Sequence, residues 1–343
     1  LLLNGVWQFA RSTFFVDRTP VTYSWVGNHF AVANSLGKEL WQHAFQQPRT
    51  VRTREDSELG PFVRFLDIDG DGSLETLVGH EDGGHGEALF CFSPDGKLLW
   101  KLDGSIAYWQ PAQTYSPAFR VRQVVTAMTE PEGTPILASG FEHVSGAVSR
   151  VIFVRPNGVK VGEYWQRNSL DDLVAGDLDG DRTSKIFVAG SNDAGRPTIA
   201  VIDPNQIPRL VPGQSPEGAV RFERHSSGGE AAIITLPKSG FAKNVGFQPR
   251  ILHLVIGSGG LRVVVSEGTM TPENEVCQPV AHLIYQFDRQ LKLMNLTPSR
   301  DFRSLFQSTL QNEPGSIDRE VERMRDEVTV DWLGEETSSL AGR

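Results

Sequence analysis

The stretch that decides the fold is Phe65–Gly79, with the sequence FLDIDGDGSLETLVG. Counted from Asp67 as position 1, aspartates stand at positions 1, 3 and 5 and Glu75 at position 9, with glycines at positions 4 and 6. The glycines allow a tight, partly left-handed turn that points alternate side chains at one centre. These carboxylates and the Ser73 carbonyl form an oxygen-only ligand set, which suits Ca²⁺ better than Mg²⁺ because Mg²⁺ prefers fewer protein ligands and retained waters. The predicted ligands of this loop are Asp67, Asp69, Asp71, Ser73 and Glu75.

Two other structures can carry an acidic loop of this length. An EF-hand also begins D-x-D-x-D-G, but it needs a bidentate glutamate at position 12, between two helices. Position 12 here is Val78, in an apolar run typical of a strand, so an EF-hand is excluded. The other is an Asp/Gly-rich hairpin without metal. Four acidic side chains at this spacing would repel one another in an empty loop, which favours a bound cation.

A second copy of the pattern occurs in AGDLDGDRTSKIFVAG, residues 175–190. Its predicted ligands are Asp177, Asp179, Asp181 and Thr183. This copy departs from the first at two positions, because Arg182 replaces the glycine at position 6 and Lys185 replaces the acid at position 9. An ammonium group at a ligand position can take the place of the cation, so the sequence leaves metal binding at the second loop open.

Both acidic loops lead into a short apolar run that ends in glycine, and on these residues the two segments resemble FG-GAP/VCBS repeats. Such repeats are the blade units of integrin-α-like β-propellers and carry calcium in a loop within the blade. The resemblance is specific over residues 60–102 and 171–203 and weak elsewhere. It implies a β-propeller fold and a binding, adhesion or sensing role.

Hairpin signals elsewhere in the chain agree with a repeated all-β unit. Asp95-Gly96 and Asn157-Gly158 each stand between apolar runs, which predicts tight turns with positive φ at the glycine. Apolar runs that end in glycine recur at intervals of roughly 45–65 residues, the length of a propeller blade and too long for a leucine-rich repeat. We therefore expect one all-β domain over residues 1–343, a single β-propeller of about six to eight blades with seven preferred.

The two ends of the chain fall outside this repeat. Residues 1–20 are expected to form an N-terminal arm or a closing strand. Apolar residues recur at helical spacing from Ile317 to Val328 among charged ones, which predicts a short C-terminal helix over residues 316–328 that packs on the body. Residues 329–333 return to an alternating pattern and favour a strand.

Composition and charge exclude some classes of function. The chain has 33 Lys and Arg residues against 42 Asp and Glu, a net charge of −9 and no basic cluster, which argues against a nucleic-acid partner. No apolar run is long enough to span a membrane. Of its 2 cysteines, Cys91 lies in an alternating apolar strand and is expected to be buried, and the sequence does not decide whether it pairs with Cys277.

The expected location is extracytoplasmic, meaning secreted, periplasmic or at the cell surface. Loop sites of this kind suit the millimolar calcium found outside the cytoplasm. The chain begins Leu1-Leu2-Leu3 without a methionine, which favours a removed preceding segment and includes the case of the outer domain of a membrane-anchored protein.

Repeated and unrepeated aromatic residues are expected to play different parts. Trp41 and Trp100 hold the same place in their repeats, so they are predicted to pack between blades. Tyr108 and Trp109 fall outside the repeat, in a loop, and are the better candidates for a ligand surface.

The sequence favours a non-catalytic binding, adhesion or sensing module, stabilised by calcium, whose partner is a protein or a carbohydrate. The alternative is an enzyme, a calcium-dependent polysaccharide lyase or glycosidase on the same scaffold, because a fold does not fix a function. Such an enzyme needs a base or paired carboxylates that converge in a cleft. The acidic residues that the sequence places belong to the metal loops, which ranks the enzyme second.

Overall fold

The structure, a computed structural model, describes residues 17–49, 62–81, 86–104, 108–110, 113–115, 119–129, 133, 135–146, 148–207, 230–267, 281–309 and 316–333. The chain divides into two compact units, each of which is described by itself. The first unit is Leu1–Ala107 with Ser116–Val121, and the second is Tyr108–Tyr115 with Arg122–Arg343. The single domain expected over residues 1–343 therefore stays a prediction.

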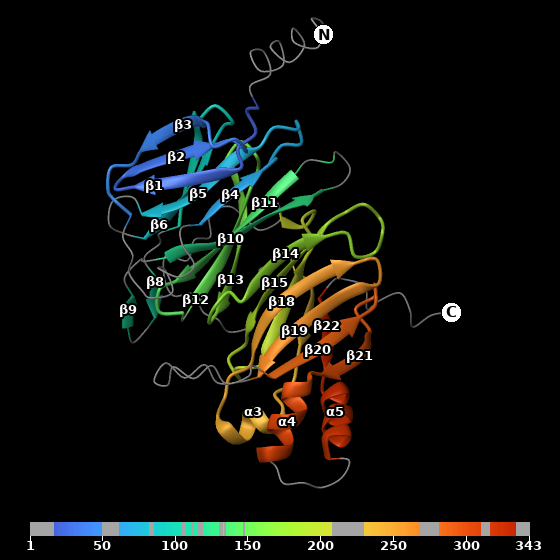
Figure 1. The fold of residues 1–343 in the computed structure, drawn as a ribbon. Helices are drawn as coiled ribbons and strands as arrows, with labels where there is room; N and C mark the ends of the chain where they lie inside the picture. The colour runs from blue at the N-terminus through green and yellow to red at the C-terminus, as the bar shows by residue number, and fades with distance from the viewer. Residues whose placement is uncertain are drawn as a thin grey trace, which may run out of the picture. The chain divides into compact units, whose positions relative to one another are not determined.

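Antiparallel β-sheets make up most of the described secondary structure, and each is built around a meander of strands that follow one another in the chain (Figure 1). The strands of the first unit are β1 (Thr22–Val26), β2 (His29–Ala33) and β3 (Glu39–Ala44) in one sheet, and β4 (Val63–Leu66), β5 (Glu75–Glu81), β6 (Glu87–Phe92) and β7 (Leu98–Asp103) in the next.

Three further meanders follow, mostly in the second unit. They are β10 (Phe119–Met128), β11 (Pro135–His143), β12 (Val148–Val154) and β13 (Lys160–Arg167); β14 (Asp172–Gly176), β15 (Lys185–Ser191), β16 (Pro197–Ile202) and β17 (Glu230–Thr235); and β18 (Arg250–Gly257), β19 (Gly260–Glu267), β20 (Ala281–Phe287) and β21 (Leu293–Pro298). A separate hairpin joins β8 (Tyr108–Gln110) and β9 (Gln113–Tyr115).

The predicted all-β fold class is confirmed. A four-stranded antiparallel meander is the unit from which propeller blades are built. The described residues form five sheets of three or more strands, a number roughly consistent with the six to eight blades expected.

Strand β15 shows why the sheets of the second unit stack face to face. Its side chains alternate between two cores, because successive residues of a strand point to opposite faces. Ile186 and Val188 pack with Phe153 of the preceding sheet, whereas Phe187 and Ala189 belong to the core shared with β18–β21. The sheet β14–β17 is therefore covered on both faces, as an apolar run of this kind requires.

One type of tight turn closes hairpins in both units. In the turn Ser93–Lys97, the Ser93 amide donates to the Lys97 carbonyl and the Gly96 amide donates to the Ser93 carbonyl, both at 2.9 Å. The same two bonds close the turns Asn34–Lys38, Arg155–Val159, Asn192–Arg196 and Asp288–Lys292. The predicted positive φ is confirmed at Gly96 (+84°), and Leu291 adopts it as well (+59°) where no glycine marks the turn.

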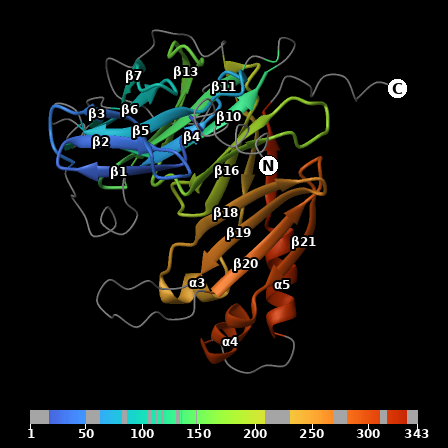
Figure 2. The same cartoon turned by 45° about the horizontal axis from the view of Figure 1, so that its top comes forward.

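Three helices gather at one end of the sheet β18–β21 (Figures 1 and 2). They are α3 (Gly240–Val245), α4 (Arg300–Thr309) and α5 (Ser316–Asp326). Helix α5 confirms the predicted C-terminal helix, whose buried Ile317 and Met324 face the core. Helices α3 and α4 were not predicted. Among the described residues, no helix has both the length and the apolar composition that crossing a membrane requires.

The chain returns after α5 to the sheet of the second acidic loop. Strand β22 (Thr329–Trp332) confirms the strand expected at residues 329–333 and pairs antiparallel with β17, from Ala232 opposite Trp332 to Thr235 opposite Thr329. It makes this sheet five-stranded.

Two expectations fall wholly or partly outside the described residues. Of the predicted N-terminal arm at residues 1–20, residues 17–20 are described, and they form no strand. Cys91 is free and 0% exposed, which confirms its expected burial, and burial raises the pKa of its thiol. Cys277 lies outside the described residues.

Candidate functional site

The first acidic loop connects β4 to β5 and brings three carboxylates together. Asp67, Asp69 and Asp71 each offer an oxygen within 4.8 Å of the others. Both Asp67 oxygens accept backbone hydrogen bonds, from the amides of Gly70 (2.7 Å) and Gly72 (3.0 Å), and those two glycines have φ of +82° and +86°. The left-handed glycines thus fold the backbone around the first carboxylate, which is the convergence that the spacing predicted.

The other two predicted ligands of this loop lie at its C-terminal side. Glu75, the first residue of β5, is 4% exposed and is not in the group of three converging carboxylates. Its Oε2 accepts a hydrogen bond from the Ile68 amide at 3.1 Å. Burial raises the pKa of Glu75, and the charges of Asp69 and Asp71 add to this effect. Ser73 donates its amide to Asp71 at 2.7 Å.

The second acidic loop connects β14 to β15 and has the same geometry. The carboxylates of Asp177, Asp179 and Asp181 converge within 4.8 Å, and the Asp177 oxygens accept from the amides of Gly180 (2.7 Å) and Arg182 (3.0 Å). Arg182 takes the glycine position with φ of +71°. The substitution therefore preserves the turn, at a strain of about 1–2 kcal/mol for a side chain in the left-handed region. Thr183 is 2% exposed and donates its amide to Asp181.

Two cations lie beside the second loop. The Lys185 ammonium pairs with Asp203, at the end of the neighbouring strand β16, at 3.5 Å. A Cβ on Gly180 would lie 3.3 Å from Nη1 of Arg289, whose other nitrogens donate to the Ser258 carbonyl at 2.9 and 3.2 Å. The first loop has a carboxylate where the second has Lys185, so the two loops share a geometry but differ in charge.

The predicted aromatic residues have separate environments. Trp41 is 8% exposed and packs in the core between the two sheets of the first unit, which confirms its predicted role. Trp100 is half-buried on β7. Tyr108 and Trp109 lie on strand β8, and their role as a ligand surface stays a prediction.

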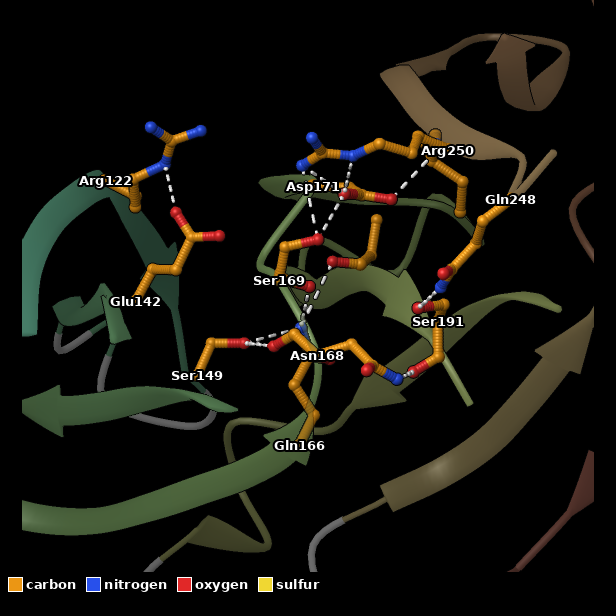
Figure 3. Close-up of polar contacts among 12 residues, drawn as sticks. Arg122, Glu142, Ser149, Gln166, Asn168, Ser169, Asp171, Ser191, Gln248 and Arg250 are labelled. Carbon is orange, nitrogen blue, oxygen red and sulfur yellow. Dashed lines mark hydrogen bonds and ion pairs between the residues drawn. The ribbon is translucent and has the colours of Figure 1, made fainter. Parts of the chain in front are cut away.

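A polar network that the sequence did not reveal ties sheets of the second unit together (Figure 3). Asp171 binds Arg250 at 2.8 Å and the Ile251 amide at 3.0 Å, so it links the segment before β14 to the start of β18. In the same region Arg122 pairs with Glu142 at 3.0 Å. The Asp171-Asp172 pair is not part of the repeated motif. The only signal for it in the sequence is that it directly precedes an apolar run.

Asp172 extends this network to three strands. Its Oδ1 accepts from Gln123 Nε2 on β10 at 2.8 Å, and its Oδ2 accepts from the Leu254 amide on β18 at 2.7 Å. The first strands of three consecutive sheets are thus bound to one carboxylate, which is 8% exposed. The network therefore joins the first strands of these sheets to one another.

A small cavity of about 150 Å³ lies between β13 and the strands β15–β17. Its lining is Tyr164, Gln166, Ser191, Asn192, Thr198, Ala200, Ile233 and Thr235. Gln166 Nε2 already donates to Ser149 Oγ at 3.2 Å and to the Ser169 carbonyl at 3.1 Å, and Ser191 Oγ accepts from Gln248 at 3.0 Å (Figure 3). Gln166 and Ser191 thus connect β13 and β15 to neighbouring segments.

No family model matches the chain, and a comparison with curated proteins finds no match. Among solved structures, the Dos1 propeller is 11% identical with a TM-score of 0.40, over 81% of this chain and 57% of its own. BBS1N, solved in complex with ARL6DN, is 12% identical with a TM-score of 0.38, over 80% and 76%. The rhamnogalacturonan lyase YesW is 11% identical with a TM-score of 0.37, over 81% and 48%. The chain therefore spans little more than half of the Dos1 propeller, and a likeness at this level says nothing about function.

Proposed function

We propose that the chain is a calcium-stabilised β-propeller module with a non-catalytic binding, adhesion or sensing role outside the cytoplasm. The observation that carries the proposal is the convergence of Asp67, Asp69 and Asp71 in the loop that leads directly into β5. An ion held there would fasten the turn that begins a four-stranded sheet. Its role would be structural because its ligands come from the hairpin itself.

Calcium is the ion that fits this donor set best. The converging groups are all oxygens, which hard cations prefer, and Ca²⁺ accepts six to eight of them in flexible geometry. Glu75 and the Ser73 carbonyl are the proposed additional ligands. The negative charges of Asp69 and Asp71 act on Glu75, and a divalent cation would offset all of these charges at once.

The second loop is proposed as a weaker calcium site formed by Asp177, Asp179, Asp181 and Thr183. Its three carboxylates converge as those of the first loop do. Lys185 and Arg289 place positive charge beside it, which lowers the affinity for a cation.

The partner and the location rest on the calcium proposal. We propose a protein or carbohydrate partner that binds at exposed loops, with Tyr108 and Trp109 among the contact residues. A weak loop site fills at the millimolar calcium found outside the cytoplasm, so we place the module there, secreted or as the outer part of a membrane-anchored protein.

Calorimetric titration with Ca²⁺ tests the proposal. Asp69→Ala should remove the tighter of two binding events, Asp179→Ala should remove the weaker one, and Mg²⁺ should compete poorly with either. Asp331→Asn, at an exposed position on β22, is the matched control and should bind as the wild type does. Equal calcium binding by the wild type and Asp69→Ala would refute the assignment of the first loop.

A further inference from the structure

A fully buried carboxyl group holds the N-terminus of helix α3. Glu267, the last residue of β19, is 0% exposed. Its Oε1 accepts the Ser239 amide at 3.1 Å, and its Oε2 forms a short hydrogen bond with the Ser239 hydroxyl. Ser239 is the N-cap of α3, and its Oγ accepts from the Ala242 amide at 3.0 Å. Glu267 therefore fixes the residue that begins the helix.

Side chains of helix α5 bind the same segment, residues 238–240. Glu320 Oε1 accepts the Gly240 amide at 2.6 Å, and Arg323 Nη2 donates to the Lys238 carbonyl at 3.2 Å. Arg323 also donates to Glu320 at 2.7 Å. Residues 238–240 are thus bound by one carboxyl group from the sheet and one from α5, so this junction connects both helices to the sheet.

The charged and polar groups around Glu267 come from two elements. Helix α5 contributes the Glu320 carboxylate and the Arg323 guanidinium, and β20 contributes the Tyr285 hydroxyl, for which the described part of the chain provides no hydrogen-bond partner. Burial raises the pKa of Glu267 from 4.5 to about 7, and the two hydrogen bonds from Ser239 oppose this effect. Glu320 adds to the rise and Arg323 reduces it.

We propose that Glu267 is a proton-controlled latch that fixes α3 and α5 to the sheet β18–β21 while its carboxyl group is protonated and loosens them when it ionises. Ionisation leaves an anion in a fully buried site near the Glu320 carboxylate, and opening the junction exposes it to solvent. When the group is protonated, Oε1 still accepts from the Ser239 amide, and the second contact reverses, with Oε2–H donating to the Ser239 hydroxyl. The latch therefore closes at lower pH.

The direction follows from proton linkage. The closed junction binds a proton more tightly than the open one, so its extra stability is fully present below the ordinary pKa of 4.5. That stability is lost as the pH rises through the raised pKa of about 7, and it levels off about one pH unit above that value. For these two values, the equilibrium constant for opening rises about tenfold between about pH 6 and about pH 8.

Hydrogen exchange followed by mass spectrometry on the full chain tests the latch. After correction for intrinsic exchange, the amides of residues 242–247 and 320–326 should lose about tenfold of their protection between about pH 6 and about pH 8. Glu267→Gln, which keeps the shape of the protonated group and cannot ionise, should make protection at these amides independent of pH. Glu142→Gln changes a buried glutamate that pairs with Arg122 outside the junction, and it should keep the wild-type pH dependence.

Infrared spectroscopy tests the latch in the wild type itself, so it does not require any variant to fold. The carbonyl stretch of a protonated carboxyl group should be present at about pH 6 and fade by about pH 8. Protection that does not change with pH in the wild type, or that changes equally in Glu267→Gln, would overturn the proposal. So would a wild-type infrared spectrum without that band.

Discussion

Trp41 lies so close to Gly96 that a Cβ on residue 96 would be 2.6 Å from the Trp41 Cγ atom. Trp41 belongs to β3, whereas Gly96 lies in the turn between β6 and β7, so the contact joins the two sheets of the first unit. The Trp41 ring also lies 5.2 Å from the Phe92 ring, centre to centre. Residue 96 must therefore be glycine for two reasons: its φ is positive, and the indole ring of Trp41 leaves no room for a Cβ.

Gly96→Ala should therefore cost more than an ordinary glycine substitution in a turn. The left-handed conformation alone costs alanine about 1 kcal/mol, and displacement of the indole ring brings the total to about 2–4 kcal/mol. Gly37→Ala is the matched control, because Gly37 has φ of +72° in the same type of turn and a Cβ added there would meet nothing within 4 Å. It should cost only about 1 kcal/mol. Urea unfolding measures both, and equal losses would show that Trp41 does not constrain residue 96.

Asp172→Asn should destabilise the second unit by about 2–3 kcal/mol. Both carboxylate oxygens accept hydrogen bonds from other strands, so either orientation of an asparagine amide turns its NH₂ group toward a donor. Gln123→Ala removes one of these donors and leaves the others in place, so it should cost only about 1 kcal/mol. Chemical denaturation measures both losses. An asparagine variant as stable as the wild type would show that the bridging carboxylate does not contribute to stability.

Local features of the structure could be predicted from the sequence because their causes lie within a few residues. The turn around Gly96 and the loop around Asp67 each have side chains and glycines that dictate the backbone directly. Helix α5 was predicted because its apolar residues recur at helical spacing. The turn at Leu291 shows the limit of this logic, since a leucine adopts the left-handed conformation there with no glycine as a signal.

Features that depend on distant residues could not be predicted. Strand β22 pairs with β17 across nearly a hundred residues of chain, and no local pattern names that partner. The bridges from Asp172 arise only when three sheets are in place. The same holds for the candidate site, because the spacing predicted the convergence of the aspartates in each loop but not the pairing of Lys185 with Asp203.

Lys185→Glu should strengthen calcium binding at the second loop. It places a carboxylate at the position that Glu75 holds in the first loop and removes the ammonium that now pairs with Asp203. We expect the affinity to rise roughly tenfold or more, because a repulsive charge becomes an attractive one. Calorimetry in the Asp69→Ala background measures the second loop alone. Lys185→Gln is the control for loss of the positive charge. If Lys185→Glu binds calcium no more tightly than Lys185→Gln does, residue 185 is not a ligand.

Removal of calcium should lower the melting temperature without dissolving the fold. A ligand that binds only the folded form stabilises it by RT ln(1 + [L]/Kd), about 2.7 kcal/mol at a hundredfold excess over Kd. In a chain of this size that corresponds to a fall of a few degrees on chelation with EDTA, measured by calorimetry or circular dichroism. The strand signal below the transition should stay largely intact, because the described residues place acidic loops in two of the five sheets.

If the first loop accounts for the effect, Asp69→Ala should melt, with or without EDTA, at the temperature at which the wild type melts in EDTA. An unchanged melting curve, together with loss of a polysaccharide-degrading activity on chelation, would make the ion catalytic and put a lyase or glycosidase in place of the binding module.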